Sequence, residues 1–285
     1  MATEPHLLFF ILVFLASFGA GAVGSLIGVG GGIFVVPLLT LAFGLSIHEA
    51  AGASIVSVIA TSSGAAAAYV RDRITNLRVG MFLEIATTLG ALSGAFLATR
   101  VSPGLLFVVF GVVLLISALP LLVKIGEELP QNVKSDRYAK TLALAGSYPD
   151  AKLRREVSYE VSRVPAGFSM MYVAGLISGL LGIGSGVFKV LAMDTAMRLP
   201  MKVSTTTSNF MIGVTAAASA GIYFQRGYIN PIVSAPVALG VLAGAMLGAK
   251  TISKLSNNTL RKVFIPFLII IAVEMLVRGV PMLFH

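Results

Sequence analysis

Cysteine is absent from the 285-residue sequence, and charged residues make up only 12% of it. Without thiols the protein has no disulfide framework, no thiolate metal site and no thiol redox chemistry. Histidine is also scarce, since His6 and His285 stand at the ends and His48 with Glu49 offers too few ligands for a metal ion. No nucleophile–base triad can be assembled. We therefore predict that the protein is not an enzyme and uses no metal or cofactor.

Apolar residues are what the sequence has in abundance. Hydrophobic residues make up 56% of the chain, and the mean hydropathy is +0.93. A soluble protein of this length cannot bury so much apolar surface. Several apolar stretches approach the roughly 20 residues that cross a hydrocarbon core, so we predict an all-α integral membrane protein. Glu4 and His6 precede the first stretch in place of a basic region, which favours a retained helix over a cleaved signal.

Ten apolar segments, separated by glycine, proline and charge, divide the chain. The first half contains Leu7–Ile27, Ile33–Phe43, Glu49–Val70, Val79–Thr99 and Leu105–Val123. The second half contains Ala166–Leu181, Val187–Met197, Val203–Phe224, Pro231–Ile252 and Lys262–Val277. The second segment of each half has only 11 residues, about 16 Å of helix. Each short segment therefore predicts a half-helix or one arm of a re-entrant hairpin.

A glycine-rich break precedes each short segment. The first is Gly28-Val29-Gly30-Gly31-Gly32, and the second, 154 residues later, is Gly182-Ile183-Gly184-Ser185-Gly186. Such a break persists in a bilayer only where protein buries it or a wet cavity adjoins it. At the same offset Ser54 matches Ser208, Thr61 matches Thr215, and Gly90 matches Gly244. We infer two copies of one five-segment unit, residues 1–124 and 165–285, joined by a linker over residues 125–164.

Loop charges predict how the two copies lie in the membrane. An odd number of segments per copy reverses the second copy. With the Arg71–Arg78 loop inside, the Lys124–Arg163 linker, Arg198 with Lys202, and the Lys250–Lys262 region also face inside, which places 17 of the 21 Lys and Arg residues on one side. The prediction is a pair of inverted repeats in the cell (inner) membrane, with a cytoplasmic linker and both termini outside.

The net charge of +9 is explained by these basic loops, so we predict no nucleic-acid partner. Within the linker, Val157–Val161 alternates like a short strand. The linker is interpreted as a cytoplasmic connector with some local structure.

The paired breaks predict an anion site at the interface of the repeats, because half-helix ends present unpaired N–H groups and partial positive charge. The alternative is that the glycines only permit close helix packing. Lys189 lies three residues after the second break, where an ammonium usually faces a cavity, a partner or the interface. We expect Lys189 to bind the anion; the alternatives are snorkelling and pairing with a carboxylate such as Asp194.

Hydroxyl residues begin the segment that follows each half-helix. They are Ser54, Ser57, Thr61, Ser62 and Ser63 in the first copy, and Ser204, Thr205, Thr206, Thr207 and Ser208, with Asn209 beside them, in the second. Neutral donors can hold an oxyanion, and we expect Ser54, Ser208 and Asn209 to do so. The others are expected to cap helices or bond between them. Glu84, inside its segment, is a candidate proton-coupling carboxylate, whereas Glu274 is expected to pair with Arg278.

These motifs resemble the sulfite exporter TauE/SafE family over nearly the whole chain apart from the linker. The resemblance is carried by Gly28-x-Gly30-Gly31-Gly32 with Pro37, by Ala51-Gly52-Ala53-Ser54, by Gly182-x-Gly184-Ser185-Gly186 and by Thr206-Thr207-Ser208-Asn209. It implies a membrane transporter for small sulfur-containing anions such as sulfite, sulfoacetate or related sulfonates. The glycine motifs then map onto Gly28, Gly30, Gly31, Gly32, Gly182, Gly184, Ser185 and Gly186. Ser185 departs from the all-glycine form, and Leu191 stands where the first copy has Pro37.

Together these observations predict a secondary transporter that works by alternating access, with protons as a candidate coupling ion. The chain contains no ATP-binding loop. An anion channel, or a transporter of another small anion, is the alternative. A membrane enzyme would need a catalytic set that the sequence lacks, and a purely structural subunit predicts that changing Lys189 leaves every flux untouched.

Overall fold

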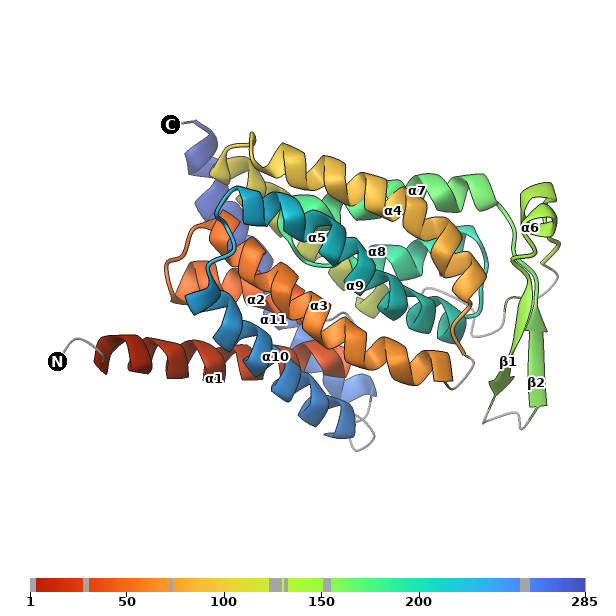
Figure 1. The fold of residues 1–285 in the computed structure, drawn as a ribbon, viewed down its shortest axis with the longest axis horizontal. Coiled ribbons are helices and arrows are strands. Elements are labelled where there is room, and N and C mark those ends of the chain that lie inside the picture. The colour runs from red at the N-terminus through yellow and green to blue at the C-terminus, as the bar shows by residue number, and fades with distance from the viewer. Residues whose placement is uncertain are drawn as a thin grey trace.

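Long helices lie side by side through the body of the molecule, and a short β-hairpin stands at one end (Figure 1). The computed structural model describes residues 4–27, 31–71, 74–122, 130, 133–150, 155–251 and 257–284. Within these residues the secondary structure is helical except for one two-stranded sheet. The first helix begins and the last helix ends at the end of the molecule opposite to the hairpin (Figure 1).

The predicted segments agree with helices to within three residues at each end, except the last, whose helix begins five residues before Lys262 and ends six residues after Val277. The first half forms α1 (Glu4–Ile27), α2 (Gly32–Pro37), the π-helical turn η1 (Leu38–Ala42), α3 (Ile47–Arg71), α4 (Leu77–Ala98) and α5 (Pro103–Leu122). The second half forms α7 (Val164–Leu181), α8 (Gly186–Leu191), the π-helical turn η2 (Ala192–Ala196), α9 (Met201–Gln225), α10 (Pro231–Thr251) and α11 (Asn257–Leu283). Each short segment is therefore a short α-helix that continues into a π-helical turn.

The linker folds into a small unit of its own, which contains α6 (Arg137–Thr141), β1 (Gly146–Asp150) and β2 (Arg155–Tyr159). The strands pair antiparallel, with Gly146 opposite Tyr159. β2 corresponds to the predicted strand, but it begins two residues before Val157 and ends at Tyr159. β1 has the sequence GSYPD, which lacks the alternation that predicts a strand.

Left-handed backbone conformations explain the second break. α7 ends at Leu181 because Gly182 adopts a φ of +71°, and Gly184 adopts +73°. Glycine reaches these angles without steric cost. Ser185, with a φ of +47°, also lies in the left-handed region and directly precedes α8. Before the first short segment, Gly31 forms a turn and α2 begins at Gly32.

The contacts between helices are related by the same correspondence of the two halves that the sequence shows. α1 packs against α10, and α7 packs against α4. α3 packs against α9, and α5 packs against α11. α3 also contacts α10, just as α9 contacts α4. When α1, α3, α4 and α5 are matched to α7, α9, α10 and α11, the α3–α9 and α5–α11 contacts map onto themselves. Each of the other contacts then maps onto another contact of the set.

Glycines allow the paired helices to approach each other closely. A Cβ atom added at Gly90 would lie 2.1 Å from the carbonyl oxygen of Tyr172, and one at Gly244 would lie 1.9 Å from that of Phe18. These two contacts are related by the offset of 154 residues. At these positions, which lie outside the two breaks, the glycines permit close helix packing.

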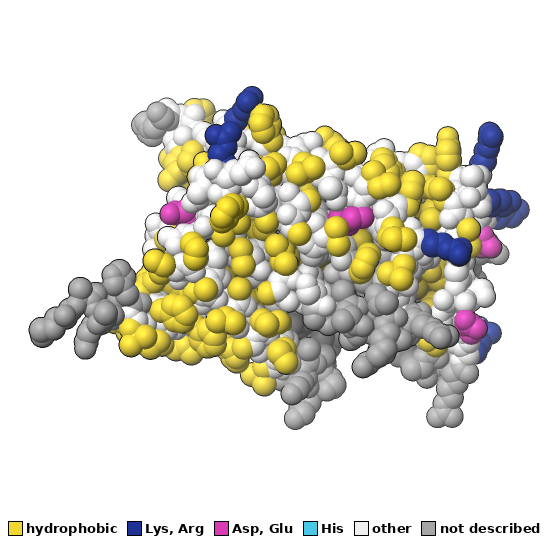
Figure 2. All heavy atoms as spheres, viewed as in Figure 1, with side chains coloured by type: hydrophobic (Ala, Val, Ile, Leu, Met, Phe, Trp, Pro, Cys, Tyr) yellow, Lys and Arg dark blue, Asp and Glu magenta, His cyan; other side chains and the backbone are white. Residues whose placement is uncertain are grey.

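The outer surface of the helices is rich in large apolar side chains, such as Met81, Ile232 and Ile270, each at least 60% exposed. In Figure 2 the middle of the visible face is mostly apolar, and Lys and Arg side chains lie toward its ends. Three described stretches are long and apolar enough to cross a membrane: Leu7–Gly24, Leu77–Ala98 and Val164–Leu181. Shorter apolar helices cover Gly32–Ala42, Pro103–Ala118 and Pro231–Leu247.

Candidate functional site

Ser54 connects the two glycine breaks. It lies on α3 and is fully buried. Its hydroxyl donates to the carbonyl oxygen of Gly182 at 2.7 Å, and the carbonyl oxygen of Gly32 lies 3.2 Å away as a second acceptor. A Cβ atom on Gly32 would come within 3.3 Å of the carbonyl oxygen of Ile183. The end of α7 and the start of α2 therefore meet in the interior, against α3.

The corresponding serine of the second half makes the corresponding contact. Ser208 is buried on α9, and its hydroxyl donates to the carbonyl oxygen of Gly186 at 3.1 Å. This bond matches the Ser54–Gly32 contact at the offset of 154 residues. Asn209 is half-buried and makes no side-chain hydrogen bond to any residue that the structure describes. The structure thus places Ser208 at the second break and gives Asn209 no such link.

The remaining glycines of the motifs differ in their surroundings. Gly31 packs against Val241, where an added Cβ atom would lie 2.4 Å from a methyl carbon. Gly184 packs against Ile212 and Val58. Gly28 and Gly30 lie outside the described residues.

Ser185 presents a buried hydroxyl at the second break. Its side chain is 3% exposed, and its Oγ has no hydrogen-bond partner in the described part of the chain. Buried hydroxyls are normally paired, because an unpaired one loses its hydration without compensation. The Ser185 hydroxyl therefore lies beside the second break without a hydrogen-bond partner among the described residues.

Lys189 is fully buried on α8, one helical turn after Ser185. Its Nζ donates to the Thr215 hydroxyl on α9 at 2.5 Å. Complete burial rules out snorkelling to a surface. The hydrogen-bond partner is a hydroxyl in place of the Asp194 carboxylate that the sequence suggested. An ammonium has three donors, and Thr215 is the acceptor that it reaches among the described residues.

Glu84 lies on the other side of Thr215. The Thr215 Oγ1 donates to Glu84 Oε1 at 2.7 Å, and the Thr88 hydroxyl donates to the same oxygen at 3.2 Å. Glu84 is 8% exposed, and its Oε2 is buried without a partner among the described residues. We call this row of three side chains the Lys189–Thr215–Glu84 chain. It joins α8, α9 and α4 through two hydrogen bonds.

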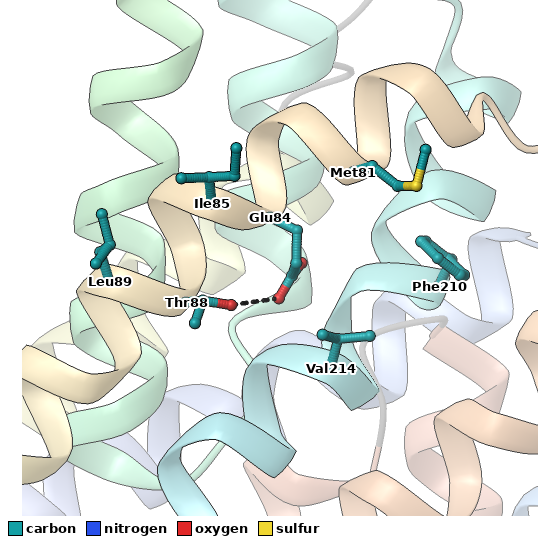
Figure 3. A pocket seen from close by; sticks show the side chains of 7 residues that line it. All are labelled: Met81, Glu84, Ile85, Thr88, Leu89, Phe210 and Val214. Carbon is teal, nitrogen blue, oxygen red and sulfur yellow. Dashed lines mark hydrogen bonds between the residues drawn. The ribbon is translucent and has the colours of Figure 1, made fainter.

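An apolar groove runs beside Glu84, between α4 and α9. Its volume is about 450 Å³, and Figure 3 shows the side chains that line it: Met81, Glu84, Ile85, Thr88, Leu89, Phe210 and Val214. Met81, Ile85 and Leu89 are each more than half exposed, so the groove opens at the outer surface of the helices. Glu84 is the one ionisable residue among the described residues that line the groove.

Sequence reasoning missed the role of Thr215, although a signal for it was present. Ser204, Ser208, Thr215 and Ser219 follow one face of α9 at intervals of four, seven and four residues, and all four are buried. Such a stripe of buried hydroxyls indicates which face of α9 packs toward the second short helix. Its sequence pattern alone does not single out Thr215, which is identified as the bridging residue by its bonds to Lys189 and Glu84.

Comparison with known proteins places the chain in a family. The family model described as sulfite exporter TauE/SafE matches residues 13–275. The chain belongs to the sulfite exporter TauE/SafE family. The resemblance of its glycine motifs to that family is thereby confirmed.

Curated TauE/SafE-like relatives are named as transporters. The probable membrane transporter protein YunE of Bacillus subtilis is 27% identical over 95% of this chain and 98% of its own length. The probable membrane transporter protein YdhB of the same organism is 26% identical over 84% of this chain and 89% of its own. The probable membrane transporter protein MJ0441 of Methanocaldococcus jannaschii is 23% identical over 90% and 91%. No solved structure matches this TauE/SafE chain significantly.

The family and the apolar helices together establish the class of protein. It is a multi-pass membrane transporter, in agreement with the prediction of transport in a lipid bilayer. The relatives' names also agree with the prediction that the chain is not an enzyme.

Proposed function

We propose that this protein is a secondary transporter that moves a small organosulfur anion, such as sulfite, sulfoacetate or a related sulfonate, by alternating access. The observation that carries the proposal is the fully buried ammonium of Lys189 beside the second break. A buried cation is costly unless charge and hydrogen bonds compensate it. Thr215 satisfies one of its three donors, and the oxygens of a bound anion would satisfy the others.

Ser185 supports the same site. Its unpaired hydroxyl lies one turn before Lys189, since the Lys189 backbone N–H donates to the Ser185 carbonyl oxygen at 3.2 Å. A sulfonate presents three oxygens, so it suits a site that combines one cation with several neutral donors. Gly182 and Gly184, on the N-terminal side of Ser185, adopt the left-handed backbone conformation that holds this break open between α7 and α8. For these reasons we propose that the anion binds at the second break.

The two five-segment units, residues 1–124 and 165–285, are proposed to lie inverted in the membrane and to rock about the α3–α9 contact. Support comes from the offset of 154 residues, which relates the Ser54 and Ser208 bonds as well as the close glycine contacts. The linker is proposed to be cytoplasmic and both termini outside. In Figure 1 the hairpin lies at one end and the outer ends of α1 and α11 lie at the other.

Uptake by purified protein in liposomes tests the function. Wild-type protein should take up labelled sulfoacetate or sulfite with saturation, and Lys189→Met should lower the initial rate more than tenfold. Lys140→Met is the matched control, because Lys140 is exposed on α6 in the linker, and it should keep wild-type uptake. A folded Lys189→Met protein that transports at the wild-type rate would show that the anion is not bound there.

Counterflow separates a transporter from an anion channel. Unlabelled sulfoacetate inside the liposomes should accelerate entry of the labelled anion, because a carrier returns faster when loaded. A channel gives no such acceleration, so its absence would favour the alternative function.

A further inference from the structure

We propose that Glu84 is the proton-carrying group of the transport cycle, and that it takes up one proton when an anion binds to Lys189. The inference rests on the proposed function, since it assumes that Lys189 binds the transported anion. It assigns a co-substrate, the proton, and fixes its number at one per anion.

The first step is the geometry of the Lys189–Thr215–Glu84 chain. Thr215 Oγ1 accepts from the Lys189 ammonium at 2.5 Å and donates to Glu84 Oε1 at 2.7 Å. A hydroxyl can accept and donate at the same time. Without an anion, Glu84 is therefore the counter-charge of Lys189, and the buried pair has no net charge.

The second step is the hydroxyl proton of Thr215, which has two acceptors within reach. Besides Glu84 Oε1, the carbonyl oxygen of Met211 lies 2.9 Å from Thr215 Oγ1. An ionised Glu84 draws this proton toward the carboxylate. A protonated Glu84 allows the hydroxyl to turn to Met211, so both protonation states leave Thr215 hydrogen-bonded.

The third step is the count of charge. A sulfonate group at Lys189 replaces Glu84 as its counter-charge and leaves the charge of the Glu84 carboxylate uncompensated in the interior, which is costly in a medium of low dielectric. One proton on Glu84 removes that charge. Its Oε2 is buried and has no partner in the described residues, so this is the atom on which the proposal places the proton.

None of the other titratable groups described on the neighbouring elements is hydrogen-bonded to the side chains of the Lys189–Thr215–Glu84 chain. The Tyr172 hydroxyl on α7 donates to Ser93, and the Tyr223 hydroxyl on α9 donates to the carbonyl oxygens of Gly179 and Leu180. Others are Arg78 at the start of α4, Asp194 on η2, Lys202 at the start of α9, and His48 and Glu49 at the start of α3, which packs against α9. Among these groups, only Glu84 is hydrogen-bonded to Thr215, the partner of Lys189.

A proton count on wild-type protein tests the proposal without any substitution. Liposomes that contain a pH-sensitive dye are given an inward gradient of sulfoacetate at neutral pH, where this anion keeps its own charges. The expected result is luminal acidification at one proton per sulfoacetate taken up. Uptake without acidification overturns the proposal but leaves the proposed function standing, whereas absence of uptake overturns the proposed function itself.

Glu84→Gln separates coupling from binding. Its amide oxygen can still accept from Thr215 but cannot exchange a proton at neutral pH. Counterflow of sulfoacetate should stay within about threefold of wild type, whereas accumulation driven by an imposed pH gradient should fall more than tenfold. Glu274→Gln is the matched control, because that carboxylate is exposed and paired with Arg278 at 3.0 Å. Wild-type accumulation by Glu84→Gln would overturn the proposal, and if this variant fails to insert, the wild-type proton count decides.

Discussion

Single hydroxyl groups hold together parts of this protein that are far apart in the sequence. The Ser54 hydroxyl links α3 to both breaks, and the Thr215 hydroxyl links a buried cation to a buried carboxylate. In each case the group between the partners is small, neutral and buried. Removing such a group leaves the partners in place but unsatisfied, so its loss costs more than one ordinary hydrogen bond.

Thr215→Val should therefore damage transport more than Thr215→Ser. Valine keeps the shape of threonine but removes the acceptor of Lys189 and the donor to Glu84. We expect uptake of sulfoacetate by Thr215→Val to fall more than tenfold and that by Thr215→Ser to stay within threefold of wild type. Equal rates for the two variants would show that the hydroxyl has no part in transport.

Ser54→Ala should destabilise the folded protein, because the carbonyl oxygen of Gly182 loses its donor in a dry interior. We expect a loss of about 1–3 kcal/mol in the free energy of unfolding. Ser63→Ala is the control, since Ser63 is exposed and bonds within its own helix to Ile59. Denaturant unfolding in detergent measures both variants, and an unchanged value for Ser54→Ala would contradict the assigned link.

Helices of this protein come together through backbone contact at glycine. α4 and α7 approach so closely that a Cβ atom at Gly90 or Gly175 would lie 2.1 Å from a carbonyl oxygen of the partner helix. Backbone atoms cannot move aside as a flexible side chain does, so an added Cβ atom would force the two helices apart. The contact between α4 and α7 therefore tolerates little added side-chain volume.

Gly90→Ala should cost about 1–3 kcal/mol of stability through overpacking. Gly221→Ala on α9 is a matched control, because an added Cβ atom there meets nothing within 4 Å. Alanine has the higher helix propensity, by about 1 kcal/mol, so the control should be neutral or stabilised. Thermal unfolding in detergent checks the pair, and equal behaviour of the two variants would contradict the close approach.

The linker docks on the helical body through Asn76. The Asn76 Nδ2 donates to the Leu144 carbonyl oxygen at 2.9 Å and to the Tyr159 hydroxyl at 2.8 Å, while its backbone N–H donates to Thr207 on α9. Burial raises the pKa of Tyr159 from its ordinary value of 10.0 to about 12. The neutral hydroxyl is thus favoured in the folded state, and this contribution is complete below pH 10.0 and is lost as the pH rises toward 12.

Tyr159→Phe should flatten the alkaline part of the stability curve. Wild-type protein should lose stability between pH 10.0 and about 12, and the variant should lose less over that range because it has no hydroxyl to ionise. Thermal unfolding at a series of pH values gives both curves. If the two curves run parallel, Tyr159 is not buried as described.

At the scale of the whole molecule, the sequence predicted more of the scaffold than of the site. Segment length, glycine runs and the offset of 154 residues are local or periodic signals, and they predicted the short helices and the position of both breaks. The bond between Glu84 and Thr215 joins residues 131 positions apart. Such a bond depends on how two helices rotate and pack, and no local pattern encodes that rotation. The docking of the linker escaped prediction for the same reason.

The absence of cysteine allows a direct test of the proposed topology. Lys140→Cys places a thiol in the linker, and Arg226→Cys places one in the turn after α9; both positions are exposed. A membrane-impermeant maleimide added to intact cells should label only the Arg226→Cys protein, and permeabilised cells should show labelling of both. Labelling of Lys140→Cys in intact cells would contradict a cytoplasmic linker.

The two halves share a backbone plan, yet Val35 stands where the second half has Lys189, and both side chains are fully buried. If the two halves exchange conformations during transport, the two resulting forms differ in energy. The reason is that Lys189, the buried lysine among the described residues, belongs to the second half alone. In the proposed alternating-access cycle, the inward-facing and outward-facing forms are therefore expected to bind the anion with different affinities. Such a carrier half-saturates at different anion concentrations on its two sides, although net flux stays zero until a gradient is applied.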